Sequence, residues 1–299
     1  MTAAITTDIA ARKPDKGTSL WADAWRRLRR NHMAMVMMVI IILYALLAIL
    51  VMTGALAADW KDTVGESYQP PSAEHLLGTD IFGQSVLRKT LYGAKISLTV
   101  ALLASLLSVA IGVPLGAIAG YFGGLIDELI VWLYSTLSSI PGFLLILAFA
   151  FVLREKLPGI SAVYLALGLT SWVGLCRLIR GEVLKHRDRD YVTAAVAYGA
   201  SRSRVIFRHV VPNVTHLILI DFSLRFVGFI HAEVILSYLG LGSKEEPSWG
   251  AMINEAKQEL ARGVWWQLAA ATTAILILSL ALNIVGDALR DALDPKLRK

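Results

Sequence analysis

The sequence has little charge and almost no cysteine. Only 17% of its 299 residues are charged, whereas 56% are hydrophobic; soluble domains average about 25% charged and about 45–50% apolar residues. A single cysteine, Cys176, excludes an internal disulfide and a cysteine-based metal cluster. It lies in an apolar run and is expected to be a small buried hydrophobe. A soluble or disulfide-stapled protein is therefore disfavoured.

The sequence also lacks the motifs of common catalytic sites. It has no Gly-x-x-x-x-Gly-Lys-Ser/Thr phosphate-binding loop, so the chain cannot itself be an ATPase of that kind. No Gly-x-Ser-x-Gly elbow is present. The histidines are too scattered to form a metal site. We therefore predict no catalytic residue, no bound cofactor and no metal in this chain.

What the sequence does have is long apolar runs of about 20 residues, enough to cross a hydrocarbon core of about 30 Å. They predict an all-α, polytopic membrane protein. Six membrane spans are expected, at 33–57, 93–120, 126–152, 160–180, 214–239 and 265–286. Pro114 predicts a kink in the second span, and Ile140-Pro141-Gly142 predicts a break in the third.

The expected organisation has three parts. Residues 1–32 form a polar N-terminal tail, 33–287 the six-helix domain with a polar loop at 181–212, and 288–299 a charged C-terminal tail. In the first tail, Trp21, Trp25 and Leu28 share one helical face opposite several arginines, a pattern typical of a helix at the membrane surface. A merely basic flank of the first span is the alternative.

The basic residues predict the orientation in the membrane. Of the 29 Lys and Arg residues, 19 lie in the two tails or in and just before the 181–212 loop, and 8 lie in the other connections. Short segments rich in Lys and Arg remain in the cytoplasm. Both termini and the loop are therefore expected in the cytoplasm, with 58–90 and 239–264 outside. The net charge of +6 thus fits membrane orientation better than nucleic-acid binding.

The polar loop contains a short predicted helix. Asp190 is a plausible N-cap, and Gly199 is a plausible residue just past the C-cap. Tyr191, Ala194, Ala195 and Tyr198 would line one face, where the small alanines permit close approach. Either this helix packs on its own membrane domain, or it docks a cytoplasmic partner. From the residues alone, both readings stay open.

A second predicted segment follows at 201–211. Val205, Ile206 and His209 would form its inner face, and Arg202 lies among the surrounding arginines. Pro212 is expected to break the helix before the fifth span.

The loop resembles the EAA loop of bacterial ABC-importer permeases. Thr193-Ala194-Ala195, three residues, Gly199, nine residues and then His209-x-Val211-Pro212 match the spacing of that loop. Thr193 stands where the family has Glu, which could complete a capping box in a helix capped at Asp190. His209 replaces Ile, as in the peptide and nickel branch. Stretches at 75–83, 92–98, 236–250 and 283–295 are similar to further signatures of that branch and, with the Trp-containing basic segment, to its C-type permeases.

The resemblance implies the function. Such permeases form half of a pathway for di- or oligopeptides, or, as the alternative, for nickel chelates or another small solute. The implied partners are a second homologous permease chain, two cytoplasmic ATPase subunits that bind ATP and Mg, and an extracytoplasmic solute-binding protein. The implied location is the bacterial inner membrane, where the chain also contacts lipid. The residues implied in ATPase coupling are Tyr191, Thr193, Ala194, Ala195, Tyr198, Gly199, Arg202, His209 and Pro212.

A secondary transporter is the rival from another class. It would explain the spans and their charges, but it does not need an Ala-Ala-x-x-x-Gly docking helix and usually shows an internal repeat.

Four polar residues fall within the fifth span: Asp221, Arg225, His231 and Glu233. Charges at membrane depth usually face a bundle interior or a water-filled cavity. They are candidates for a polar substrate pathway. Structural bridging is the alternative, and it is favoured for Asp221 and Arg225, which can pair four residues apart.

Overall fold

The fold is helical throughout the part of the chain that the computed structural model describes, residues 20–157 and 159–293. Within those ranges only two isolated bridges, Thr63 with Gln84 and Thr79 with Ser85, pair extended backbone. The predicted all-α class is confirmed. The predicted tail at 1–19 lies outside the described residues, as do 294–299.

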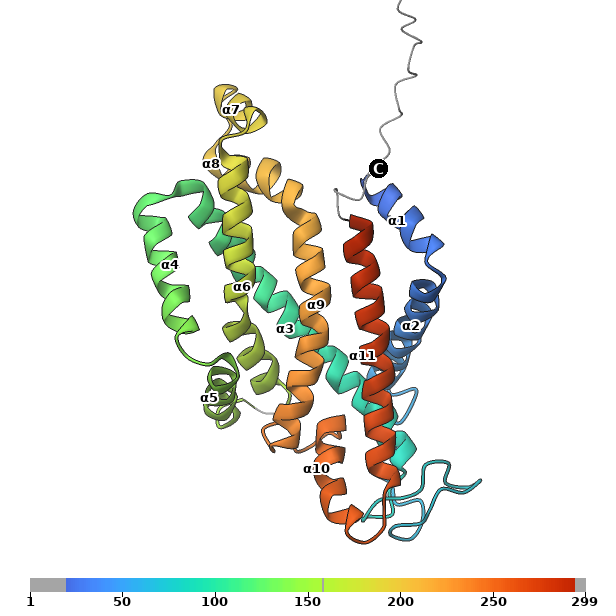
Figure 1. Ribbon diagram of the computed structural model, residues 1–299. Helices are drawn as coiled ribbons and strands as arrows, with labels where there is room; N and C mark the ends of the chain where they lie inside the picture. The colour runs from blue at the N-terminus through green and yellow to red at the C-terminus, as the bar shows by residue number, and fades with distance from the viewer. Residues whose placement is uncertain (1–19, 158, 294–299) are drawn as a thin grey trace, which may run out of the picture.

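The helices follow one another along the chain as α1 (Leu20–Arg30), α2 (His32–Met52), α3 (Val86–Phe122), α4 (Gly124–Ser138), α5 (Gly142–Arg154), α6 (Ser161–Arg187), α7 (Asp190–Ala197), α8 (Arg202–Arg204), the π-helix η1 (Val205–Val210), α9 (Val211–Tyr238), α10 (Trp249–Leu260) and α11 (Trp266–Leu293). Figure 1 shows that α1, α7 and the end of α11 lie at one end of the bundle, here called the α7 end. The 53–85 connection and α10 lie at the opposite end, the α10 end.

Each predicted span corresponds to a helix or a bent pair of helices. Among the described residues, α2, α3, α6 and α11 are each long and apolar enough to cross a membrane. Helices α4 and α5 qualify together but meet at 87° across the break at 139–141, as the proline and glycine there predict. Helix α9 is not in this group, yet it runs between the two ends of the bundle and packs against α3, α6 and α11. The structure is that of a multi-pass membrane protein.

Several helices extend beyond the predicted spans. Helix α3 begins at Val86, because the Ser85 side chain caps it by accepting from the amide of Arg88. Helix α6 continues to Arg187, and α11 continues to Leu293 into the predicted C-terminal tail. Polar residues there end the apolar run but not the helix. Helix α10, in the predicted outer loop, was missed.

Small residues bring α3 and α6 together. A Cβ on Gly116 would come within 2.5 Å of the carbonyl oxygen of Cys176, and one on Gly120 within 2.7 Å of that of Arg180. Such close backbone contact is a common way for membrane helices to associate.

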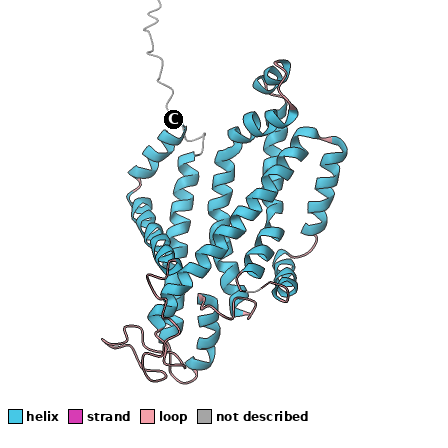
Figure 2. Ribbon diagram, turned by 180° about the vertical axis from the view of Figure 1, so that it is seen from behind, coloured by secondary structure: helices cyan, strands magenta, loops and turns pink. Residues whose placement is uncertain are grey.

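Cys176 is buried, as predicted. Pro114 lies inside the continuous α3. Figure 2, which views the bundle from the opposite side to Figure 1, shows α3 crossing it obliquely.

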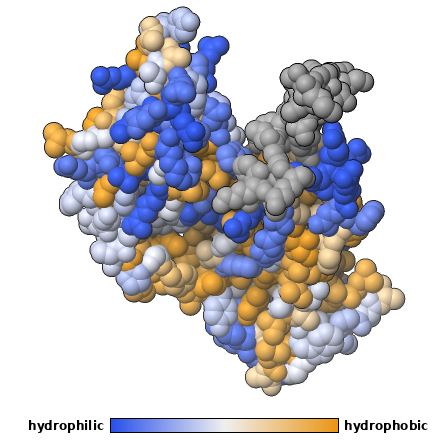
Figure 3. Space-filling view, turned by 45° about the horizontal axis from the view of Figure 1, so that its top comes forward, coloured by the Kyte–Doolittle hydropathy of each residue, from blue (hydrophilic) through white to orange (hydrophobic). Residues whose placement is uncertain are grey.

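Apolar side chains remain exposed along the middle of the bundle. Helix α2 shows this most clearly: only Ala34, Ala48 and Val51 are buried among its 21 residues. Figure 3 shows hydrophilic surface gathered at the α7 end and apolar surface farther down. This is the distribution of a protein whose sides face lipid. In α1, Leu28 is buried and Trp25 is exposed, so the predicted single face is divided between them.

Candidate functional site

Helix α7 projects from the end of the bundle (Figure 1) and is held from one side. Val192 is its only buried side chain, packed in a cluster with Val183 of α6 and with Val205 and Ile206 of η1. In contrast, Tyr198 is 92% exposed. The predicted inner positions Val205 and Ile206 are confirmed as buried. One apolar anchor thus leaves most of the helix surface free.

The ends of α7 differ from the prediction at one position. Arg189 is the N-cap, without a side-chain hydrogen bond, and Asp190 is the first helical residue. There its carboxylate suits the positive end of the helix dipole. At the other end, Gly199 has φ +80°, and its amide donates to Val196 O at 2.9 Å. Ala200 N donates to Ala195 O at 3.0 Å, which completes a Schellman motif.

The predicted face of α7 is mostly open. Tyr191 and Ala194 are exposed, whereas Ala195 is half-buried against the Val192 cluster. The Tyr191 hydroxyl lies 2.8 Å from Nδ1 of His186 in α6, which fixes its ring. Thr193 is exposed and donates to Arg189 O at 3.4 Å. Because the helix begins at Asp190, Thr193 is the fourth helical residue and not the third, so a Glu there would not complete the predicted capping box.

The chain continues from α8 into α9 without the break predicted at Pro212. The residues of η1 form a widened turn, and Val211 N donates to Ile206 O, five residues back. Pro212 is the second residue of α9 and has no amide hydrogen to donate to the carbonyls of η1, so the continuous helix lacks one backbone hydrogen bond there. His209 is half-buried, and its carbonyl accepts from Asn213 Nδ2 at 2.6 Å.

Cationic side chains surround the base of α7. Arg180 of α6 binds Asp127 of α4 with both nitrogens, Nε at 2.5 Å and Nη2 at 2.7 Å. The guanidinium of Arg202 lies 5.7 Å from the ring centre of Phe122 at the end of α3. The first contact joins α6 to α4, and the second joins α8 to α3. The Asp127–Arg180 pair was missed because its partners are 53 residues apart.

The charged pair in α9 contacts a neighbouring helix. Arg225 Nε donates to Asp221 at 2.5 Å, and its Nη1 donates to Ser171 O of α6 at 2.9 Å. The pair therefore bridges two helices.

Glu233 and His231 lie on different sides of α9. Glu233 is 1% exposed and accepts hydrogen bonds from Ser97 of α3 at 2.6 Å and Ser237 at 2.7 Å. This burial favours the structural alternative over an open pathway position. His231 is exposed and is hydrogen-bonded to Ser279 of α11 at 2.9 Å. The four candidate pathway residues are not gathered at one cavity.

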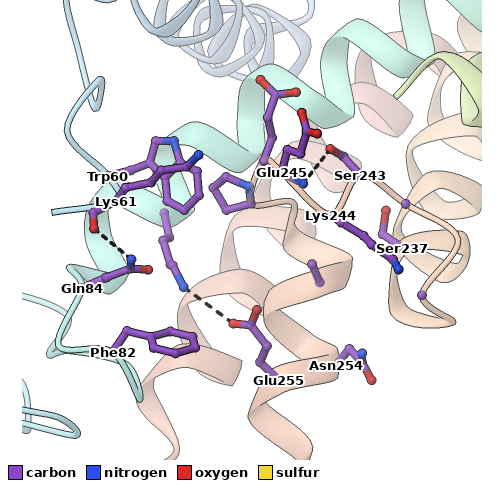
Figure 4. Close-up of a pocket in the computed structure, with 16 residues that line it drawn as sticks. Trp60, Lys61, Phe82, Gln84, Ser237, Ser243, Lys244, Glu245, Asn254 and Glu255 are labelled. Atoms are coloured by element: carbon purple, nitrogen blue, oxygen red, sulfur yellow. Dashed lines mark hydrogen bonds and ion pairs between the residues drawn. The ribbon is translucent and has the colours of Figure 1, made fainter. Parts of the chain in front are cut away.

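A cavity of about 830 Å³ opens at the α10 end instead. Its lining carries charges of both signs, among them Lys61, Lys244, Glu245 and Glu255, as Figure 4 shows. Glu246, which also lines the cavity, accepts from Lys95 at 2.8 Å. This cavity was not predicted, because it forms only where the connection at 58–85, the loop after α9 and helix α10 come together.

The protein-family comparison matches two models that together cover most of the chain. Residues 112–299 match the binding-protein-dependent transport system inner membrane component. Residues 19–71 match the N-terminal TM domain of oligopeptide transport permease C.

Similar curated proteins extend over nearly the whole length. The dipeptide transport system permease protein DppC of Bacillus subtilis is 38% identical, over 93% of this chain and 86% of that protein. The oligopeptide transport system permease protein OppC of the same species is 36% identical, over 95% of this chain and 92% of that one. The glutathione transport system permease protein GsiD of Escherichia coli O6:K15:H31 is 36% identical, over 96% and 94%.

A solved structure shares the fold. An inward-facing structure of the MetNI methionine ABC transporter aligns with a TM-score of 0.55 and 14% identity, covering 69% of this chain and 96% of that one. At this identity the likeness concerns the fold alone. The family match over more than half of the sequence, and relatives above 30% identity over nearly all of it, establish that this chain belongs to the binding-protein-dependent transport system inner membrane components, the permeases of ABC importers.

Proposed function

We propose that this chain is a permease subunit of an ABC importer for peptides and that α7 couples it to cytoplasmic ATPases. The observation that carries the proposal is the exposure of α7: Val192 is its one buried side chain, whereas Tyr191, Ala194 and Tyr198 are exposed. Alanines let a partner surface approach closely, and tyrosines beside them contribute area at low entropic cost.

The coupling surface, defined as the exposed side of α7 with Gly199 and Arg202, supports docking into a groove. Its left-handed turn at Gly199 fixes the direction in which the helix ends. Val192 packs with Val183 of α6, and the Arg180–Asp127 bridge joins α6 to α4, so a displacement of α7 would pass to both helices. Movement of two such helices, one from each permease, would then alternate the access of the pathway.

The partners follow from the same proposal. A second, related permease completes the pathway, and two ATPase subunits bind ATP and Mg on the cytoplasmic side. An extracytoplasmic solute-binding protein delivers substrate at the α10 end. We place the α7 end, with both termini, in the cytoplasm, because the tails and the 181–212 loop carry most of the Lys and Arg residues.

Peptides are the proposed substrate class. The named relatives are permeases of dipeptide, oligopeptide and glutathione transport systems, and peptides carry both an amino and a carboxylate group. Nickel chelates are the alternative, because the sequence signatures are those of a branch that serves both. Substrate-stimulated ATP hydrolysis by the assembled importer with a defined dipeptide or with a nickel chelate separates the two.

Coupling is tested by a charged substitution on the open side of α7. In the assembled importer, Ala194→Glu should reduce co-purification of the ATPases and abolish substrate-stimulated ATP hydrolysis. Ala261→Glu is the matched control, since Ala261 is an exposed alanine at the α10 end. If Ala194→Glu leaves both measurements at the level of the control, the coupling assignment is wrong.

A further inference from the structure

The contact between α10 and α11 contains more buried hydrogen-bond acceptors than donors. Gln267, in the first turn of α11, is buried, and its Nε2 donates to Met252 O at 3.2 Å and to Glu255 Oε2 at 3.0 Å. Both acceptors belong to α10. Glu259 follows Glu255 by four residues and therefore lies on the same helical face.

Two buried oxygen-bearing groups in this contact have no hydrogen-bond partner among the described residues. Glu259 is 3% exposed, and neither of its carboxylate oxygens is paired. The Gln267 Oε1 atom is also buried and unpaired. An ionised carboxylate and an amide oxygen are both acceptors only, whereas a protonated carboxyl group has one O–H to donate. A proton on Glu259 would supply the donor that this contact lacks.

The surrounding charges also favour that proton. Asp80, in the connection before α3, is fully buried, and Glu255 is 43% exposed at its side chain. Lys89 of α3 is the cation that faces these carboxylates, and it is already paired with Asp80 and lies 3.7 Å from Glu255 Oε2. The contact thus holds three carboxylates and one cation.

Burial raises the pKa of Glu259 to about 7, with further upward contributions from Glu255 and Asp80 and a downward one from Lys89. Because the folded chain then holds this proton more tightly than an unfolded chain does, the contact is strongest at acid pH. It weakens as pH rises from the ordinary carboxyl range through about 7.

We propose that Glu259 is a proton-binding site that controls the packing of α10 on α11. With the proton bound, the Glu259 O–H donates within the contact and the two helices stay closed. When the proton leaves, a buried and unpaired carboxylate remains near Glu255 and Asp80, and this loosens the contact.

The proton has a short route to bulk water. Glu255, one helical turn from Glu259, lines the 830 Å³ cavity at the α10 end, and Figure 4 shows its side chain there with the ion pair that it forms. The site would therefore respond to the pH of the medium at that end. Helix α10 joins α9 to α11, so a change in its packing reaches two long helices.

Two measurements on the assembled importer in lipid nanodiscs test the proposal across about one pH unit on either side of 7. The first is the infrared band of protonated carboxyl groups, which should fade with a midpoint near pH 7 in the wild type and lack this component in Glu259→Gln. The second is amide hydrogen exchange of residues 249–267, corrected for the intrinsic rate. It should rise at least several-fold with pH in the wild type and stay low in Glu259→Gln.

A neighbouring substitution gives the direction of the electrostatic effect. Glu255→Gln removes a negative charge, so it should move the midpoint to lower pH. Glu128→Gln, an exposed carboxylate at the α7 end, should leave the midpoint unchanged. The proposal is overturned if Glu259→Gln retains the wild-type pH dependence, or if Glu259 titrates in the ordinary carboxyl range, as it would if a buried water or ion satisfied its charged form.

Discussion

The two ends of the bundle are held together in different ways. At the α7 end, a short helix buries one side chain, Val192, and exposes most of its surface. At the α10 end, buried ionic and polar groups, among them Asp80, Lys89 and Gln267, tie loops to helices. The first arrangement leaves a surface for a partner, whereas the second closes the chain on itself. A transporter that is driven from one side and opened on the other needs both.

The largest effect is expected from breaking the buried ion pair at the α10 end. Lys89→Met leaves Asp80 as a fully buried charge without its cation, which should lower the free energy of unfolding by about 3–5 kcal/mol. Arg88→Met is the control, because the neighbouring Arg88–Asp59 pair is 37% and 49% exposed and should contribute at most about 1 kcal/mol. Unfolding of the purified chain in detergent provides the measurement. Equal losses of unfolding free energy in the two variants would contradict the claim that the buried Lys89–Asp80 pair stabilises this end.

The next effect is expected at the anchor of α7. Val192→Ala removes apolar contact from a buried position and should cost roughly 1–3 kcal/mol, concentrated in the helix itself. Amide exchange of residues 190–200 should therefore rise sharply while the rest of the bundle keeps its protection. Val196→Ala, at a side chain that is 50% exposed on the same helix, should change neither the stability of the helix nor its amide exchange. A uniform loss of protection across the bundle would show that α7 is not held separately.

A smaller effect is expected at the C-terminus of α7. Gly199 has φ +80°, so Gly199→Ala should cost about 1–2 kcal/mol by placing a Cβ in the left-handed region. Gly181→Ala, at a helical glycine of α6 whose added Cβ meets nothing within 4 Å, should be neutral or slightly stabilising. The readout is ATPase co-purification together with thermal unfolding. Indistinguishable behaviour of the two variants would show that the Schellman motif at Gly199 does not stabilise the end of α7.

The smallest effect is expected from restoring the carboxylate that the EAA loop carries. Thr193→Glu cannot form a capping box at the fourth helical position, so only the helix dipole favours it, by about 0.3–1 kcal/mol. ATPase association should tighten only slightly, relative to the uncharged Thr193→Gln. A large gain would mean that the carboxylate contacts the ATPase directly.

The sequence predicted what depends on local pattern. Apolar runs located the spans, Pro141 and Gly142 located the break between α4 and α5, and Gly199 located the end of α7. Helix α10 was missed because its buried face includes Glu259 beside Met252 and Ala256, which does not read as an apolar stripe.

What depends on distant contacts could not be predicted. The Asp127–Arg180 bridge joins residues 53 positions apart, and the burial of Glu233 depends on Ser97 of α3, 136 positions away. The continuous path through Pro212 depends on the widened turn of η1, which a proline alone does not indicate.

The central claim is that α7 docks on the ATPases, and site-directed cross-linking tests it most directly. Cys176, the only cysteine, is buried, and Cys176→Ser provides a cysteine-free background. In that background, Ala194→Cys in the assembled importer should form a cross-link to a subunit that contains the phosphate-binding loop, identified by mass spectrometry. Ala261→Cys at the α10 end should form none. Absence of the cross-link at position 194, or equal cross-linking at both positions, would contradict the account.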